Sequence, residues 1–208
     1  MWYYYFVAKR FYPQHLKKRR RRLVAAVLGF VALALLAGGL GLYRREASKI
    51  SWKTYANEEL GVRLTYPETF GEEVLSEQYQ KADIVFRIKR EDPSAFFSLR
   101  YEGELGIMKA FGGGDILDQL IIAIERRYPA NFPDYRKDNY REITLAGEKA
   151  AQFDFTYTGA DGETRVKQRL VLVVKDETVY YLSCQSPEEG FFKSEKEFDR
   201  MIESFQFL

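Results

Sequence analysis

The feature that most constrains this chain is an uncharged apolar segment that directly follows a block of cations. Leu23–Tyr43 contains no charged residue, and six basic residues precede it: Lys17, Lys18, Arg19, Arg20, Arg21 and Arg22. A helix rises about 1.5 Å per residue, so this segment would reach roughly 30 Å, the thickness of the hydrocarbon core of a bilayer. We predict one transmembrane helix at residues 23–43.

The distribution of basic residues predicts the orientation of this helix. Because Lys and Arg are in excess on its N-terminal side, residues 1–22 are expected in the cytoplasm and the C-terminal part outside the plasma membrane. A cleaved signal peptide is the alternative, since Ala37-Gly38-Gly39 supplies small residues near the end of the apolar run. Arg44 and Arg45 directly beyond it favour an uncleaved anchor. The predicted organisation is a tail at 1–22, the membrane helix, a linker at 44–51 and an exported domain at 52–208.

Net charge differs sharply between the two parts of the chain. Residues 1–45 hold ten of the 32 Lys and Arg and no acid, which leaves 22 basic and 30 acidic residues, a balance of −8, in the remainder. An acidic domain repels polyanions, so a nucleic-acid partner is not expected. The basic block is instead expected to attract anionic lipid head groups at the cytoplasmic face.

The first residues are unusually aromatic for a cytoplasmic tail, beginning with Trp2, Tyr3, Tyr4 and Tyr5. Trp and Tyr favour the membrane interface, where an apolar ring meets a polar tip. We expect the tail to lie along the inner membrane surface, and docking of a partner protein is the alternative. In the apolar run, small residues four apart, such as Ala25 and Gly29, are compatible with a homodimer.

The exported part is predicted to be a single α+β domain. Alternating apolar residues and turn signals predict strands at 52–55, 62–66, 83–90, 95–102, 143–145, 150–158, 164–175 and 179–186. Helical spacing predicts a helix that Asp115 caps and Pro129 ends, followed by a polar loop ahead of Ile143. A last helix is expected from Ser194, with Glu197 as its capping-box partner. Strands without a βαβ rhythm indicate an antiparallel sheet with helices packed against it.

The order of several short motifs resembles the PsbP-like family and its bacterial DcrB-like relatives. The opening motifs are Tyr55-x-Asn57 and Gly61-Val62-x-Leu64-x-Tyr66-Pro67-x-x-Phe70. The later ones are the helix at 115, Gly147 before Ala150-Ala151-x-Phe153, Val179-Tyr180-Tyr181-Leu182, and Ser204-Phe205. The resemblance covers residues 52–207, and Phe70 stands where the family usually has Trp.

This resemblance implies a central antiparallel sheet with helices on both faces, in a domain that usually binds rather than catalyses. Its relatives include extrinsic photosystem subunits, bacterial envelope proteins and a Ran-binding import factor. The metal-binding residues proposed for some photosynthetic members do not map onto this sequence, so the resemblance implies no metal site and no cofactor.

Catalytic patterns are sparse in the exported part. The only histidine, His15, lies in the predicted cytoplasmic tail, which removes the commonest general base and metal ligand. Cys184 falls on the apolar side of a strand and is expected to be a buried, inert thiol. Three carboxylate pairs, Glu58-Glu59, Glu72-Glu73 and Glu188-Glu189, are expected to be solvated, with calcium binding as an alternative.

A glycine-rich segment, Gly112-Gly113-Gly114-Asp115, precedes the first long helix without a Walker pattern. We expect a loop that borders a cleft near residues 103–115. The leading hypothesis is a non-catalytic, membrane-anchored protein of the bacterial envelope that binds another envelope protein. The alternatives are a domain that binds a small ligand or Ca²⁺ in that cleft, and a hydrolase.

Overall fold

The computed structural model describes residues 50–103 and 115–208, and Ile50–Leu208 form one compact unit. The predicted membrane helix, the tail at 1–22 and Gly112, Gly113 and Gly114 lie outside the described residues. Within residues 50–103 and 115–208, no helix is long and apolar enough to cross a membrane.

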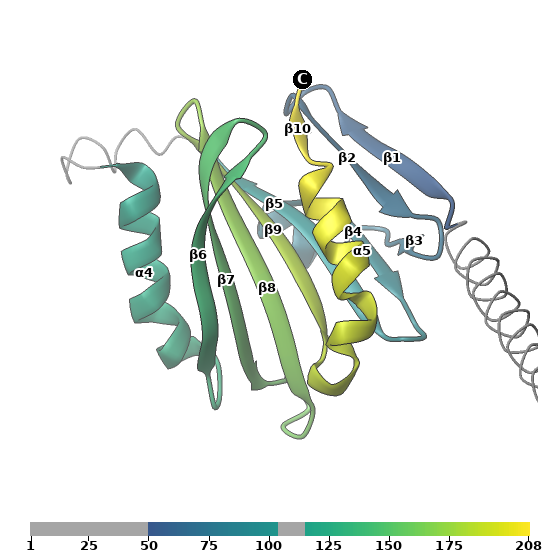
Figure 1. Cartoon of the computed structure of the whole chain (residues 1–208), viewed down its shortest axis with the longest axis vertical. Coiled ribbons are helices and arrows are strands. Elements are labelled where there is room, and N and C mark those ends of the chain that lie inside the picture. Colours follow the sequence, from purple (N-terminus) through teal and green to yellow (C-terminus); the bar gives the residue numbers. More distant parts are fainter. Residues whose placement is uncertain (1–49, 104–114) are drawn as a thin grey trace, which may run out of the picture. The chain divides into compact units, whose positions relative to one another are not determined.

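A seven-stranded antiparallel sheet forms the centre of the domain (Figure 1). Its order is β3-β4-β5-β9-β8-β7-β6. The strands are β3 (Gly71–Glu72), β4 (Ile84–Arg90), β5 (Ala95–Glu102), β6 (Arg136–Leu145), β7 (Glu148–Thr158), β8 (Arg165–Lys175) and β9 (Thr178–Pro187). A second sheet joins β1 (Trp52–Asn57), β2 (Val62–Pro67) and β10 (Gln206–Phe207) in the order β1-β2-β10.

Helices pack on both faces of the large sheet, as predicted. The described helices are α2 (Glu77–Lys81), α4 (Ile116–Asn131) and α5 (Phe191–Glu203), and a 3-10 turn at Glu188–Gly190 leads into α5. Apolar residues of α5 share a core with β2, β4, β5 and β9, whereas those of α4 share a separate core with β7 and β8 (Figure 1). The predicted α+β fold with a central antiparallel sheet is therefore confirmed for the described domain.

Strand β9 illustrates how one strand serves both cores. Successive side chains of a strand point to opposite faces. Tyr180, Leu182 and Cys184 are buried on the α5 side, and Val179 belongs to the α4 core. The predicted burial of Cys184 is confirmed, and burial raises the pKa of its thiol.

The polar loop predicted ahead of Ile143 is wrong, because Arg136–Leu145 form the edge strand β6. Most of its side chains are exposed, so the alternation of apolar and polar residues that signals a strand is absent. Charged residues on an edge strand discourage pairing with other chains. Lys137 pairs with Glu125 of α4 at 2.6 Å, which joins this edge to the helix.

The predicted end of the first long helix and the predicted start of the last helix are also wrong. Helix α4 continues through Pro129 to Asn131, and Phe132 N donates to Tyr128 O at 2.9 Å beyond the proline. Tyr128 is held against the sheet by Phe155, with ring centroids 5.3 Å apart, so packing offsets the backbone bond that proline cannot make.

Ser194 lies inside α5 rather than at its start, which is at Phe191. Its hydroxyl accepts a hydrogen bond from Arg90 at 2.7 Å, and Glu197 forms an ion pair with the same guanidinium at 2.6 Å. These two residues therefore bind a β4 side chain instead of capping the helix.

Two neighbouring phenylalanines test the α5 core. Phe191 is 2% exposed and Phe192 is 68% exposed. We expect Phe191→Ala to lower the free energy of unfolding by about 3–5 kcal/mol, because it leaves a cavity beside Phe198, and Phe192→Ala to change it by less than about 0.5 kcal/mol. Urea unfolding of the full-length chain followed by circular dichroism measures both, and equal effects would contradict the assigned packing.

Candidate functional site

Helix α4 covers only part of its face of the sheet. It packs mainly on β7 and β8 and reaches β9 at Val179, and among the described helices it leaves most of β5 and β9 uncovered on that side. On the opposite face, α5 packs on both β5 and β9. The same two central strands are therefore buried on one side and open to a hollow on the other.

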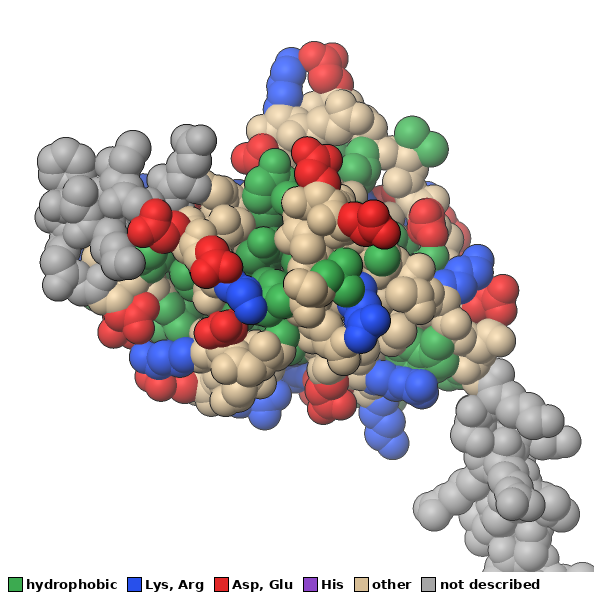
Figure 2. All heavy atoms as spheres, turned by 90° about the horizontal axis from the view of Figure 1, so that it is seen from above, with side chains coloured by type: hydrophobic (Ala, Val, Ile, Leu, Met, Phe, Trp, Pro, Cys, Tyr) green, Lys and Arg blue, Asp and Glu red, His purple; other side chains and the backbone are tan. Residues whose placement is uncertain are grey.

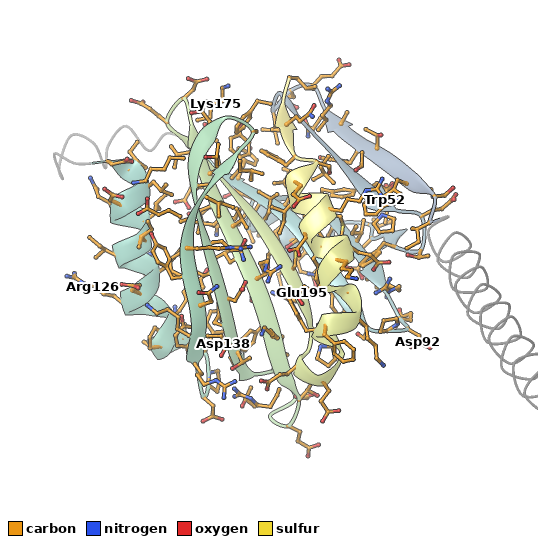
Figure 3. All side chains as sticks on the ribbon, in the orientation of Figure 1. Trp52, Asp92, Arg126, Asp138, Lys175 and Glu195 are labelled. Atoms are coloured by element: carbon orange, nitrogen blue, oxygen red, sulfur yellow. The ribbon has the colours of Figure 1, made fainter. Side chains whose placement is uncertain are left out.

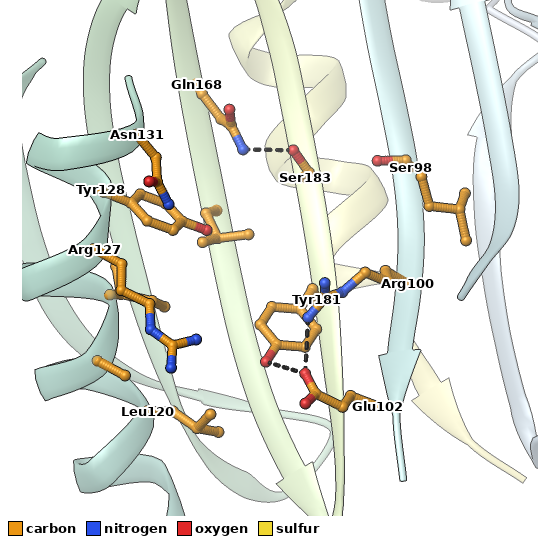
Figure 4. Close-up of a pocket in the computed structure, with 14 residues that line it drawn as sticks. Ser98, Arg100, Glu102, Leu120, Arg127, Tyr128, Asn131, Gln168, Tyr181 and Ser183 are labelled. Carbon is orange, nitrogen blue, oxygen red and sulfur yellow. Dashed lines mark hydrogen bonds and ion pairs between the residues drawn. The ribbon is translucent and has the colours of Figure 1, made fainter. Parts of the chain in front are cut away.

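A cavity of about 570 Å³ lies between α4 and strands β4, β5, β8 and β9 (Figure 4). Ser98 and Ser183 are directly opposite each other in the pairing of β5 with β9, and their short side chains leave space between larger neighbours. The polar residues that line the cavity are Ser98, Arg100, Glu102, Arg127, Tyr128, Asn131, Gln168, Tyr181 and Ser183.

One group of polar side chains in this cavity is already paired. Glu102 accepts from Arg100 Nη2 at 2.9 Å and from the Tyr181 hydroxyl at 3.1 Å (Figure 4). The Arg100 guanidinium also lies 4.0 Å from the Tyr181 ring centroid. Burial raises the pKa of Tyr181 to about 12, so its hydroxyl stays protonated at neutral pH. These three interacting side chains line one end of the cavity.

A second group has no partner. Within the described residues, the side chains of Arg127, Asn131 and Ser98 and the hydroxyl of Tyr128 make no hydrogen bond or ion pair. Figure 4 shows Arg127, Tyr128 and Asn131 reaching from α4 over the strands. Burial raises the pKa of Tyr128 to about 12, so this hydroxyl is also a donor at neutral pH. Several hydrogen-bonding groups are thus available to a ligand.

A second hollow of about 540 Å³ lies further along the same strands. Gln185, which lines the second hollow, donates to Oε1 of Gln168, which lines the first, at 3.0 Å. Phe96, Tyr157, Val166 and Pro187 give the second hollow a more apolar lining. We call the two hollows together the α4 groove.

The sequence predicted a cleft near residues 103–115 rather than the α4 groove. Asp115 is the N-cap of α4, as predicted, and its carboxylate accepts from Leu117 N at 2.9 Å, so it is not directed to a ligand. Residues 104–114 of the expected cleft near 103–115 lie outside the described residues, and neither Gly103 nor Asp115 lines the groove; Glu102, just before that range, does. The membrane-surface residues predicted in the tail, and the block at 17–22, also lie outside them.

The spacing of residues in α4 would have predicted that Arg127 and Asn131 lie on its sheet-facing side, a pattern that the sequence analysis did not use. Leu120, Ile124, Arg127 and Asn131 are spaced by four, three and four residues, which places them on one face of a helix. Because Leu120 and Ile124 are buried against the sheet, Arg127 had to lie beside it rather than point away.

The predicted carboxylate pairs do not converge on a metal site. In the described parts of the chain, no group of three His, Cys, Asp or Glu side chains is placed to hold a metal ion. Glu73 pairs with Arg87, and Glu188 pairs with Arg136 at 3.1 Å and Arg165 at 3.6 Å. These acids serve ion pairs, so the described residues give no support to the calcium alternative.

Comparison with solved structures identifies the fold. The chain is similar to cyanobacterial PsbP (CyanoP) from Synechocystis, with a TM-score of 0.53 and 12% identity over 76% of this chain and 94% of that one. It is also similar to the Ran-binding protein Mog1p of Saccharomyces cerevisiae, with a TM-score of 0.50 and 9% identity over 76% and 96% of the two chains. The described domain therefore has a PsbP-like fold, as the sequence motifs predicted, whereas the likeness to DcrB-like proteins stays a prediction.

Comparisons at the sequence level are less informative. The model of the family "Serine/threonine kinase C-terminal domain" matches residues 109–207, which is less than half of the chain. No curated protein matches the chain.

If the groove residues serve a ligand rather than the fold, their removal should not destabilise the domain. We expect Arg127→Ala to change the free energy of unfolding by less than about 0.5 kcal/mol, because Arg127 has no partner within the described residues. Arg90→Ala should cost about 3 kcal/mol, because it leaves the half-buried Glu197 carboxylate unpaired. Urea titration of the full-length variants measures both, and a large loss for Arg127→Ala would indicate a structural role.

Proposed function

We propose that this chain is a non-catalytic, single-pass membrane protein of the bacterial envelope whose extracytoplasmic domain binds a partner protein in the α4 groove. The observation that carries the proposal is the half-covered sheet face, where Arg127, Asn131, Ser98 and Tyr128 present unpaired polar groups beside α4. Arg127 and Asn131 are exposed, so these groups are accessible to a ligand, and hydrogen-bonding groups that converge on a concave surface favour a binding role.

The chemistry of the groove favours binding over catalysis. Its ionisable residues are Arg100, Arg127, Glu102, Asp161 and three tyrosines, Tyr128, Tyr157 and Tyr181, and burial raises the pKa of all three phenols. The one histidine of the chain is His15, outside the domain, and the one cysteine is buried on the opposite face of the sheet. A general base or nucleophile poised near neutral pH is not among these groups.

The structural comparisons support the same class of function without fixing the partner. Mog1p, whose fold this domain shares, is described as a Ran-binding protein, so this architecture can present a protein-binding surface. A fold alone does not select a function, and the proposal therefore rests on the groove.

The proposed anchor would keep the domain attached to the membrane. Residues 23–43 form the proposed span, and the basic residues at 17–22 favour a cytoplasmic N-terminus. Only residues 44–49 separate the span from the described domain, a stretch that extends to roughly 20 Å at most. The partner would then be an envelope protein that reaches the outer surface of the plasma membrane.

A small polar ligand is the second candidate. The volume of the larger hollow, about 570 Å³, lies within the usual range for small-molecule pockets. This function would require no contact between α4 and another protein.

The proposed topology can be tested with fusions to the C-terminus of the full-length chain. We expect an alkaline phosphatase fusion to be active and a green fluorescent protein fusion to be dark, because the former folds only after export and the latter fails to mature there. The mass of the membrane-bound chain should retain residues 1–43, whereas a shortened chain would identify a cleaved signal peptide.

Replacement of Lys17–Arg22 by neutral residues should reduce the active fraction of the phosphatase fusion, because the charge asymmetry that sets orientation is lost. An active cytoplasmic reporter on the unaltered chain would contradict the proposed localisation.

Contact with a partner can be tested by photo-crosslinking in intact cells. We expect a chain carrying p-benzoylphenylalanine at Asn131 to form a discrete protein adduct, because Asn131 lies in the groove. The matched control carries the same group at Arg126, which points from α4 away from the sheet (Figure 3). Adducts of equal yield at both positions, or none at Asn131, would contradict binding of a protein in the groove.

A further inference from the structure

We propose that the α4 groove binds an extended acidic segment of its partner, with a carboxylate at Arg127 and an apolar side chain about four residues away. This inference rests on the proposed function and specifies the chemistry of the bound segment. Three features of the groove carry it: an uncompensated guanidinium, a floor of amides and hydroxyls, and an apolar second hollow.

The pairing of charges in the groove leaves one cation without a partner among the described residues. The charged side chains are Arg100, Glu102 and Arg127 in the first hollow and Asp161 in the second. Glu102 already accepts from Arg100 at 2.9 Å, and Asp161 accepts from Thr164 N at 2.9 Å. The acids on the other side of α4 are engaged elsewhere, since Asp118 pairs with Lys149 at 3.2 Å and Glu125 pairs with Lys137. Arg127 is therefore left with one positive charge and a planar set of donors, which match a carboxylate.

The floor of the groove suits a peptide backbone. Ser98 on β5 and Asn131 on α4 have no partner within the described residues, and both can donate and accept. Gln168 Nε2 already donates to Ser183 Oγ at 2.8 Å, so each of these two side chains keeps only part of its hydrogen-bonding capacity. A peptide backbone presents one N–H donor and one carbonyl acceptor per residue, so it can use both kinds of group. Ser98 and Ser183 face each other on β5 and β9, and Gln168 lies on β8 opposite Gln185, so these groups form a row across the strands rather than a single point.

The geometry of the strands fixes the spacing within the bound segment. The polar hollow is centred near Tyr181 and Ser183, and the apolar hollow near Gln185 and Pro187, which are four residues further along β9. Four residues of a strand span about 13 Å. In an extended segment that follows the groove, the acidic and apolar side chains are therefore about four residues apart.

A random library of eight-residue peptides, displayed on phage and selected on the full-length chain in detergent, tests this inference. We expect the enriched sequences to contain Asp or Glu and, four positions from it, an aromatic or branched aliphatic residue. The enriched peptides are then synthesised with acetylated and amidated ends, so that terminal charges do not contribute, and titrated by calorimetry.

The key comparison is between two adjacent arginines of α4. Arg127→Ala should weaken binding of the selected peptide about tenfold or more, because a charge-assisted hydrogen bond is lost. Arg126→Ala removes the same charge from the outward side of the helix and should change affinity less than twofold (Figure 3). Replacing the Asp or Glu of the peptide by Asn or Gln should weaken binding as much as Arg127→Ala does.

Three results would overturn the inference: no enrichment, enriched peptides without an acid, or equal affinities for the Arg126 and Arg127 variants. The unfolding midpoint of Arg127→Ala serves as the folding control. An adduct at Asn131 together with any of these results would leave the proposed protein-binding role standing and refute only the acidic segment. Failure of the adduct, with selective binding of small carboxylates at Arg127, would instead favour the small-ligand candidate.

Discussion

The two-residue period of strand β9 is the constraint on which the rest of the domain depends. Its Tyr180, Leu182 and Cys184 complete the core beneath α5, while Tyr181 and Ser183 face the groove beside α4. A shift of one residue in its pairing with β5 would exchange these two sets, since register decides which face each side chain occupies. Core and candidate site are therefore specified by the same alignment.

The charged residues on the two faces of the sheet contrast in how they are paired. On the α5 face, the buried Arg169 contacts the carboxylates of Asp154, Asp199 and Glu195, and Figure 3 shows Glu195 on α5 above the strands. On the same face Arg90 is bound by Ser194 and Glu197. Figure 2, which presents one end of the molecule, shows acidic and basic side chains both spread over that surface. Arg127, on the α4 side, has no such partner within the described residues.

Much of the fold could be predicted from the sequence because it rests on local signals. Alternation in β5, β8 and β9 and the Asp115 cap are properties of neighbouring residues, and they were predicted correctly. The exposed strand β6 lacked that alternation, and the end of α4 depends on the packing of Tyr128 against Phe155. The groove joins Ser98, Arg127 and Ser183, which are distant in sequence. Which sheet face a helix leaves open is decided by tertiary packing, so no local pattern reveals it.

The position of Cys184 has a consequence for the compartment in which this domain is proposed to work. It is the only cysteine of the chain, and its side chain is fully enclosed between the sheet and α5. A single thiol cannot form a bridge within the chain, and an enclosed one with a raised pKa is a poor target for oxidants or for exchange with other thiols. The described domain is consequently held together without a disulfide, and its one thiol gives oxidants and exchanging thiols little to react with.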